Sequence, residues 1–263
     1  MARFQLRSNV VSGGLSLFLA LWPFTLSAQT ATRPSRTPVL VELFTSEGCS
    51  SCPPADALLM KLDQQQPVDG AEIIVLGEHV DYWDHLGWHD RFSSRQYTER
   101  QNEYGNHFHL QSVYTPEMVV DGAQEFVGND ANRARQAIMR AAQTPKVSLV
   151  LSSPVVEGTR VTAVLSAPMS STSLPVGDVY AALVDPAAKT DVRGGENAGR
   201  QLHHVGVVRS LQRIGRLQDL AAAPIKISLN APADTIPGKE RLVVFAQRPG
   251  QGAVLGAVWI NSK

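Results

Sequence analysis

Cys49 and Cys52 are the only cysteines in the chain, and they lie three residues apart. A disulfide between them would close too short a loop to restrain much of the unfolded chain, because loop-closure stabilisation grows with loop length. The pair is therefore a poor structural staple, and the 263-residue chain must be stabilised by buried cores. Redox exchange and soft-metal binding are the two remaining interpretations of thiols at this spacing.

The N-terminal segment has the pattern of an export signal. Two arginines precede a largely apolar stretch over residues 10–26, and Ala28 is a small residue of the kind that signal peptidase accepts. We expect a signal peptide over residues 1–28, cleaved near Ala28, and a disordered leader over 29–37. The protein is then periplasmic or secreted, where disulfides persist. An uncleaved anchor is the alternative, but the apolar stretch is short and interrupted for a membrane span.

The charge of the chain argues against two classes of partner. The sequence has 24 lysines and arginines and 24 aspartates and glutamates, for a formal net charge of +0. Proteins that bind nucleic acid or membrane surfaces by electrostatics need concentrated lysine and arginine. We therefore expect no nucleic-acid partner. We also expect no membrane span after signal cleavage, because no later apolar run is long enough.

The first half of the mature chain alternates strand and helix patterns. Apolar side chains after the cysteines recur at helical spacing, and Asp121-Gly122 is a typical hairpin turn between two short strands. Strands are expected at 39–44, 72–77, 118–120 and 125–127, and helices directly after Pro53-Pro54, at 90–104, and from a cap at Asn129 or Asp130 to about 142.

The second half has short β-type runs separated by Gly, Pro and Ser, with no convincing helix between them. These runs are 147–151, 160–165, 179–184, 205–211, 225–229, 242–246 and 254–260. Such a series is typical of an antiparallel sandwich. We therefore predict an α/β domain over residues 38–145, followed by an all-β, sandwich-like domain over 146–263.

The position of the cysteines suits redox chemistry. A strand ends just before them, and two prolines that a first helical turn tolerates follow them. A thiolate at a helix N-terminus is stabilised by the partial positive charge there, so the pKa of the thiol falls. Cys49, the outer member, is expected to attack a substrate disulfide. Cys52, expected one helical turn in, is expected to resolve the mixed disulfide.

The order of these elements resembles the thioredoxin fold. Thr115-Pro116 stands where that superfamily carries a cis-proline against its active-site sulfurs. The resemblance implies that Pro116 is cis and that Thr115 and Pro116 line a substrate groove. The alternative is an ordinary trans bond that opens a strand.

Longer motifs are similar to those of a bacterial exported family known as domain of unknown function 1223. They are VELFTSEGCSSCPPAD at 41–56, HVDYWD at 79–84, LGW at 86–88, YTP at 114–116 and GGENAGR at 194–200. The resemblance implies a thioredoxin-like domain and a redox role, without an established substrate. The chain departs from true thioredoxins at Gly48, where they have a tryptophan, and this leaves the redox potential open.

The stretch 79–90 is rich in histidine, aspartate and aromatic side chains. Its ligands are numerous enough for a metal, but they lack the helical His-Glu spacing of a zinc enzyme. We therefore expect no metal site, and favour an insertion that packs on the domain through Tyr82, Trp83 and Trp88. His79, at the end of a strand, is expected to lie near the cysteines and, with Glu47, to tune a thiol.

The segment from Arg193 to Arg200 is a glycine-rich loop followed by His203-His204. It does not lead from a strand into a helix as phosphate-binding loops do, so a nucleotide site is rejected. Two interpretations stay open. The loop packs against the first domain, or it forms a lip over the cysteine groove that selects partners.

Together these patterns predict an exported thiol–disulfide oxidoreductase-like protein that exchanges disulfides through Cys49 and Cys52. Its expected partners are protein or small-molecule thiols and disulfides and a redox partner protein, and no cofactor is expected. Two alternatives stay open: a non-enzymatic carrier of copper or zinc that uses the same cysteines, and a binding module whose redox site is vestigial.

Overall fold

The computed structural model describes residues 1–2, 4–5, 36–168, 173–236 and 238–262. The expected signal cleavage near Ala28 and most of the expected leader lie outside the described residues. Thr37, assigned to that leader from the sequence, already belongs to the first strand. No helix in the described part is both long and apolar enough to cross a bilayer.

Strands and helices alternate along the first half of the described chain. Their order is β1 (Thr37–Thr45), α1 (Pro53–Gln65), β2 (Ala71–His79), α2 (Arg95–His107), β3 (Glu117–Val120), β4 (Gln124–Val127) and α3 (Ala131–Ala142). Each element expected there is present. The helix expected from Asp90 begins at Arg95 instead, because the Ser94 hydroxyl caps it by accepting the Gln96 amide.

The second half is built from strands and two short 3-10 turns. Their order is β5 (Val150–Leu151), β6 (Val155–Glu157), β7 (Arg160–Ser166), β8 (Asp178–Asp191), η1 (Gly195–Asn197), β9 (Gln201–Arg216), η2 (Leu217–Ala221), β10 (Ile225–Asn230), β11 (Arg241–Gln247) and β12 (Val254–Asn261). Each expected run contains a strand. β8 and β9 are far longer than expected, at 14 and 16 residues, because they pair with each other as one long antiparallel hairpin.

The strands of both halves share one large mixed sheet. Its order is β12-β11-β8-β9-β2-β1-β3-β4, and a small antiparallel sheet holds β10, β7 and β5, with β6 paired to β7. The sandwich-like arrangement is therefore only partial, since four of the later strands extend the sheet of the first half. Residues from 36 onward belong to one compact unit. Whether the parts before and after residue 145 fold separately stays a prediction.

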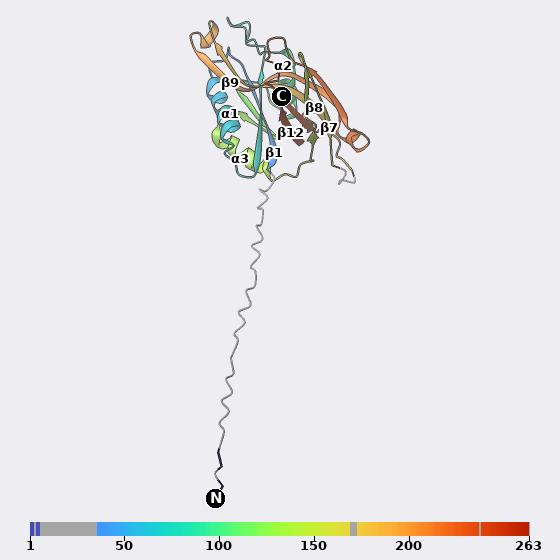
Figure 1. The fold of residues 1–263 in the computed structure, drawn as a ribbon. Helices are drawn as coiled ribbons and strands as arrows, with labels where there is room; N and C mark the ends of the chain where they lie inside the picture. The colour runs from blue at the N-terminus through green and yellow to red at the C-terminus, as the bar shows by residue number, and fades with distance from the viewer. Residues whose placement is uncertain (3, 6–35, 169–172, 237, 263) are drawn as a thin grey trace. The chain divides into compact units, whose positions relative to one another are not determined.

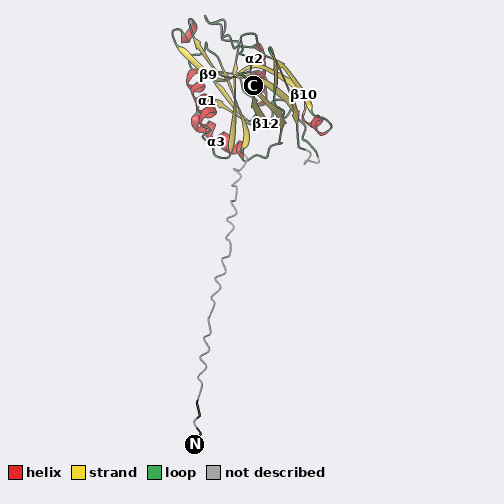
Figure 2. Ribbon diagram, in the orientation of Figure 1, coloured by secondary structure: helices red, strands yellow, loops and turns green. Residues whose placement is uncertain are grey.

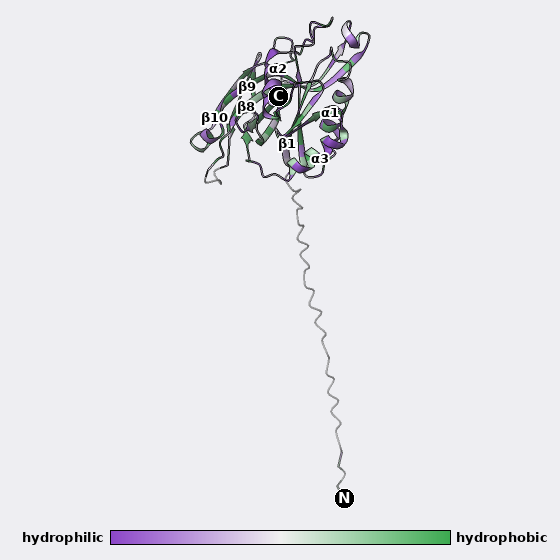
Figure 3. Cartoon of the chain, turned by 180° about the vertical axis from the view of Figure 1, so that it is seen from behind, coloured by the Kyte–Doolittle hydropathy of each residue, from purple (hydrophilic) through white to green (hydrophobic). Residues whose placement is uncertain are grey.

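Four apolar cores lie among the described residues, and three of them join the layers. Figures 1 and 2 show α1 and α3 next to each other, with α2 away from them. Alternate residues of β1 point to opposite faces, as strand geometry requires. Val39, Val41 and Leu43 pack with α1 and α3. Leu40 packs on the other face with Tyr97 of α2 and with strands β8, β9 and β11. A third core lies between the small sheet and the later strands of the large one. Figure 3 shows mainly hydrophobic colour on the central strands and hydrophilic colour at the tip of the β8–β9 hairpin.

Two glycines allow β9 to reach β2. The parallel pairing of these strands is limited to Gly77 with Val207. Gly206 has φ of 62°, and a Cβ there would lie 2.7 Å from the carbonyl oxygen of Val75. A larger residue at 206 would therefore be strained and would push the strands apart. This close approach carries residues of the second half toward the cysteines.

Candidate functional site

Cys49 and Cys52 form a disulfide at the junction of β1 and α1, with Cα atoms 5.4 Å apart. Cys52 is the N-cap of α1, so it precedes the helix instead of lying one turn inside it. Its carbonyl oxygen accepts the amides of Ala55 and Asp56, the first hydrogen bonds of the helix. The two sulfurs therefore lie at the helix N-terminus.

Both cysteines are completely buried, at 0% exposure. Only the two residues between them, Ser50 and Ser51, are exposed, and Ser51 Oγ lies 3.3 Å from Cys49 Sγ. Exposure therefore does not distinguish an outer from an inner sulfur in this disulfide state. The expected roles of Cys49 as nucleophile and Cys52 as resolving thiol stay predictions.

The tip of the β8–β9 hairpin covers the cysteine turn (Figure 1). Asn197 donates its side-chain amide to the carbonyl oxygens of Glu47 and Cys49, at 2.9 Å each. The Ser50 amide donates to Glu196 Oε2 at 3.0 Å. The glycine-rich loop thus packs on the first half at the cysteines themselves. Its role in selecting partners stays a prediction.

The insertion after β2 contributes to the same surroundings. Trp88 Nε1 donates to Glu47 Oε2 at 2.8 Å, and Trp83 Nε1 donates to Thr115 Oγ1 at 2.8 Å. The backbone of the insertion also meets the hairpin tip, because a Cβ on Gly194 would lie 2.3 Å from the carbonyl oxygen of Gly87. The tryptophans of the insertion therefore bond side chains around the cysteines.

Asp90 connects His79 to Glu47. Its Oδ2 accepts the Glu47 amide at 2.9 Å and lies 2.6 Å from His79 Nδ1. Burial opposes ionisation of Asp90, but His79 and the backbone amides of Glu47 and Phe92 outweigh it and lower the pKa of Asp90 to about 2. The structure thus brings together both residues that the sequence assigned to thiol tuning, with an aspartate that was not assigned.

His204 of β9 was not predicted as a site residue. Its Nε2 lies 3.6 Å from Glu47 Oε1, and its Nδ1 lies 3.6 Å from Asp56 Oδ1. Burial disfavours its charge, but the two carboxylates prevail and raise the pKa of His204 to about 10. The sequence held one weak signal: two adjacent histidines on a strand must face opposite sides. The structure shows that His204 is the buried one and His203 the exposed one.

The Thr115–Pro116 bond is cis, in agreement with the conformation that the thioredoxin resemblance implies. Pro116 is buried, and a Cβ on Gly128 would lie 3.2 Å from the Cβ atoms of both Pro116 and Ala55. The proline therefore lies near the first turn of α1. No contact of the described residues tests a substrate groove.

The remaining histidines of the insertion are exposed. His85 is exposed, and His89 forms an exposed ion pair with Asp84 at 2.8 Å. Among the described residues no group of three or more His, Cys, Asp or Glu side chains is placed to hold a metal ion.

A second buried polar cluster lies on the α2 side of the sheet. Arg100 forms ion pairs with Glu42 at 2.6 Å and with Glu78 at 3.5 Å, and Tyr104 donates to Glu42 at 2.5 Å. Burial, together with the neighbouring Glu42, raises the pKa of Glu78 well above its usual range. Arg100 also donates to Gln247 and Gln251, so this cluster joins the two halves.

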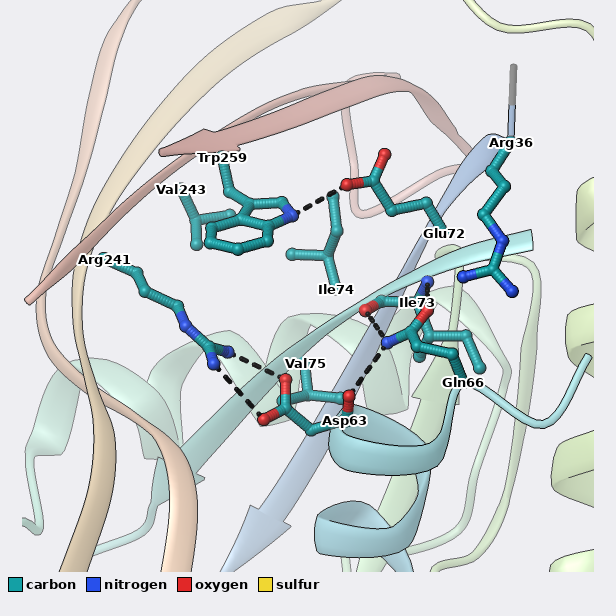
Figure 4. A pocket seen from close by; sticks show the side chains of 10 residues that line it. All are labelled: Arg36, Asp63, Gln66, Glu72, Ile73, Ile74, Val75, Arg241, Val243 and Trp259. Carbon is teal, nitrogen blue, oxygen red and sulfur yellow. Dashed lines mark hydrogen bonds and ion pairs between the residues drawn. The ribbon is translucent and has the colours of Figure 1, made fainter. Parts of the chain in front are cut away.

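A cavity of about 300 Å³ opens near the start of β2 (Figure 4). Two pairs lie on its polar rim: Arg241 bonds Asp63 at 2.8 Å, and Trp259 Nε1 donates to Glu72 at 2.9 Å. Figure 4 shows these side chains over a floor formed by the apolar residues of β2. The cavity lies at the end of β2 where the strand begins, whereas His79 is at the other end. Neither cysteine lines the cavity.

The sequence matches the profile described as "Protein of unknown function (DUF1223)" over residues 40–247. The crystal structure of protein AGR_C_4864 from Agrobacterium tumefaciens is similar, with 27% sequence identity and a TM-score of 0.64 over 87% of this chain and 96% of that chain. A domain of the outer membrane lipoprotein Omp28 from Porphyromonas gingivalis matches at 12% identity over 44% of this chain and 88% of its own, with a TM-score of 0.24, too low to support any conclusion. No curated protein matches significantly.

Proposed function

The chain belongs to the DUF1223 family of proteins of unknown function, and from this premise we propose that it is an exported thiol–disulfide oxidoreductase. The observation that carries the proposal is the Cys49–Cys52 disulfide at the N-terminus of α1. A bond between residues three apart contributes little as a staple. A helix N-terminus favours the thiolate that disulfide exchange requires.

The parts around the disulfide support a thioredoxin-like assignment of the first half. β1 and β2 are parallel and are connected through α1, and β3 and β4 form an antiparallel hairpin at the other edge of β1. A cis-proline directly precedes β3. These features have the order that the resemblance implied. They therefore support the redox proposal independently of the spacing of the two cysteines.

The exchange step balances without a cofactor. A thiolate of a partner dithiol attacks Cys49 Sγ, the Cys49–Cys52 bond breaks, and its electron pair leaves on Cys52 Sγ. The second partner thiol, once deprotonated, attacks the partner sulfur of the mixed disulfide and releases Cys49 as a thiolate. The partner loses two electrons and two protons, and the protein gains both as a dithiol. The reverse sequence reduces a partner disulfide.

Exchange requires the hairpin tip to move, because both cysteines are fully buried. The contacts that must open are those of Asn197 with the carbonyls of Glu47 and Cys49, and that of Glu196 with the Ser50 amide. Thr115 and Pro116 then become the wall along which a partner chain lies. In this proposal the tip acts as the lip of the groove and limits which partners reach the sulfurs.

The proposal is tested by mixing the oxidised protein with a reduced, unfolded substrate protein and following disulfide formation. We expect oxidation that is lost in both Cys49→Ser and Cys52→Ser. When reduced Cys52→Ser is instead mixed with a substrate disulfide, we expect a trapped mixed disulfide through Cys49, because no second thiol resolves it. The matched control is the double variant, which lacks both thiols. The function is overturned if the wild type exchanges disulfides with the substrate protein no faster than the double variant, in both the oxidising and the reducing direction. That result favours a binding module.

Export is a separate part of the proposal. The protein is placed in the periplasm or outside the cell, after cleavage of the signal near Ala28. N-terminal sequencing of protein isolated from its native cells is expected to begin near Gln29. A chain that retains residues 1–28 and fractionates with the cytoplasm contradicts this.

A further inference from the structure

A histidine from the second half of the chain lies between the two carboxylates that flank the disulfide. Glu47 is two residues before Cys49, Asp56 is four residues after Cys52, and His204 has one ring nitrogen 3.6 Å from each carboxylate. The exposed fractions are 0% for Glu47, 6% for Asp56 and 2% for His204. Three ionisable groups are thus buried together, and two of them lie within four residues of a cysteine in the sequence.

The contacts of this cluster are electrostatic more than hydrogen-bonded. Both ring nitrogens of His204 and Glu47 Oε1 are buried without a hydrogen-bond partner in the described part of the chain. Buried carboxylates require compensation, because their charge is poorly screened away from water. The His204 ring lies within ion-pair range of both carboxylates and compensates them together.

We infer that His204 is a positioning residue for the disulfide exchange: its imidazolium offsets the charges of Glu47 and Asp56 and so favours the thiolate that forms when the Cys49–Cys52 bond opens. The inference rests on the proposed function. It assigns to the second half of the chain a part in setting the redox equilibrium of cysteines that belong to the first half.

The surroundings keep His204 charged. The pKa of His204 is raised to about 10 against burial, because Asp56 and Glu47 favour the protonated ring. The other titratable groups that face it come from β2 and from the insertion. His79 lies with its ring centroid 4.8 Å from that of His204, and Asp90 is paired with His79. Phe92 supplies an apolar face at 6.1 Å.

The sign of the effect follows from the charges. Opening the disulfide creates negative charge on sulfur, and the carboxylates of Glu47 and Asp56, on either side of the cysteines in the sequence, oppose it. Loss of the His204 cation therefore disfavours the thiolate and shifts the equilibrium toward the disulfide. Loss of the Asp56 anion does the reverse. A merely structural role for the cluster does not predict opposite shifts from two substitutions that face each other.

The test measures the equilibrium of the cysteine pair in glutathione buffers, by trapping thiols and weighing the products. The variants are His204→Gln and Asp56→Asn, with His203→Gln as a matched control, since His203 is the exposed neighbour on the same strand. We expect about a tenfold shift toward the disulfide in His204→Gln, equivalent to about 30 mV. We expect a shift toward the dithiol in Asp56→Asn and no change in His203→Gln.

An unchanged equilibrium in His204→Gln, or shifts of the same sign in both cluster variants, overturns the inference. If His204→Gln does not fold, Asp56→Asn decides alone. The inference is then overturned if the equilibrium constant for forming the dithiol is equal to or below that of the wild type. Failure of the proposed function is a different result. The wild type then exchanges no disulfide with a substrate protein, while its equilibrium with glutathione still reports on His204.

Discussion

Asn197 donates its side-chain amide to the carbonyl oxygen of Cys49 at 2.9 Å, across a separation of 148 residues. The same nitrogen donates to Glu47, and the side chain of Asn197 is itself held by Arg200 at 3.2 Å. One buried residue of the hairpin tip thus fixes the backbone on the N-terminal side of the disulfide. Access to the sulfurs is thereby coupled to the stability of contacts that the second half of the chain supplies.

Asn197→Ala should make the disulfide more reactive toward a small reductant. The substitution removes two buried hydrogen bonds that close the tip, and the loss of about 1.4 kcal/mol from the closed state raises the open population tenfold. We expect the rate of reduction by dithiothreitol to rise about tenfold.

The control is Asn230→Ala, an exposed asparagine on the small sheet that should leave the rate unchanged. Equal rates for wild type and Asn197→Ala would mean that the tip does not limit access.

The charge of His204 should appear in the pH dependence of stability. Its folded-state pKa, about 10, is above the ordinary value of 6.5. The stabilisation that protonated His204 gives the folded state is therefore complete below pH 6.5 and is lost as pH rises toward 10. We expect the free energies of unfolding of the wild type and His204→Gln, measured in urea at pH 6, 8 and 10, to converge as pH rises. The difference between them should shrink by at least about 1.4 kcal/mol, the value of one pKa unit. A gap that stays constant over this range contradicts a charged, paired His204.

The local parts of this fold were predictable because their signals are local. The apolar run at 39–44 and the spacing of Leu59 and Leu62 each indicate one element and its buried face. The turn at Asp121-Gly122 fixed the hairpin of β3 and β4 for the same reason.

The union of the two halves was not predictable from these signals. β9 meets β2 at a single parallel pair, Gly77 with Val207, and one pair leaves no periodic pattern in the sequence. Asn197 and His204 became site residues only through that contact, because a lone buried asparagine or histidine has no distinguishing spacing. The loop motif at 194–200 indicated a contact with the first domain or the cysteine groove, but not which of its residues makes that contact.

Arg100→Met should destabilise the protein strongly. Arg100 is 4% exposed and faces Glu42 and Glu78, so its removal leaves a buried carboxylate without a counter-ion. Breaking such a pair from one side costs about 3–5 kcal/mol. Urea unfolding at neutral pH measures the loss.

The matched control for that substitution is Arg95→Met on the same helix, which breaks an exposed ion pair with Glu99 and should cost less than about 1 kcal/mol. Similar losses for both arginines would show that the cluster on this face contributes no more than a surface pair.

Gly206→Ala should separate the strain of a left-handed residue from the closeness of β9 to β2. Gly206 and Gly199 have φ of 62° and 81°, so alanine at either position costs about 1–2 kcal/mol in backbone strain. A Cβ at 206 would also lie 2.7 Å from the Val75 carbonyl, whereas a Cβ at 199 has nothing within 4 Å. We therefore expect Gly206→Ala to lower the free energy of unfolding in urea by at least about 1 kcal/mol more than Gly199→Ala does.

Gly206→Ala should also shift the cysteine equilibrium toward the disulfide, as His204→Gln does, because His204 moves with the strand. Equal losses of stability would show that β9 adjusts freely, and that its contact with β2 does not fix the position of His204.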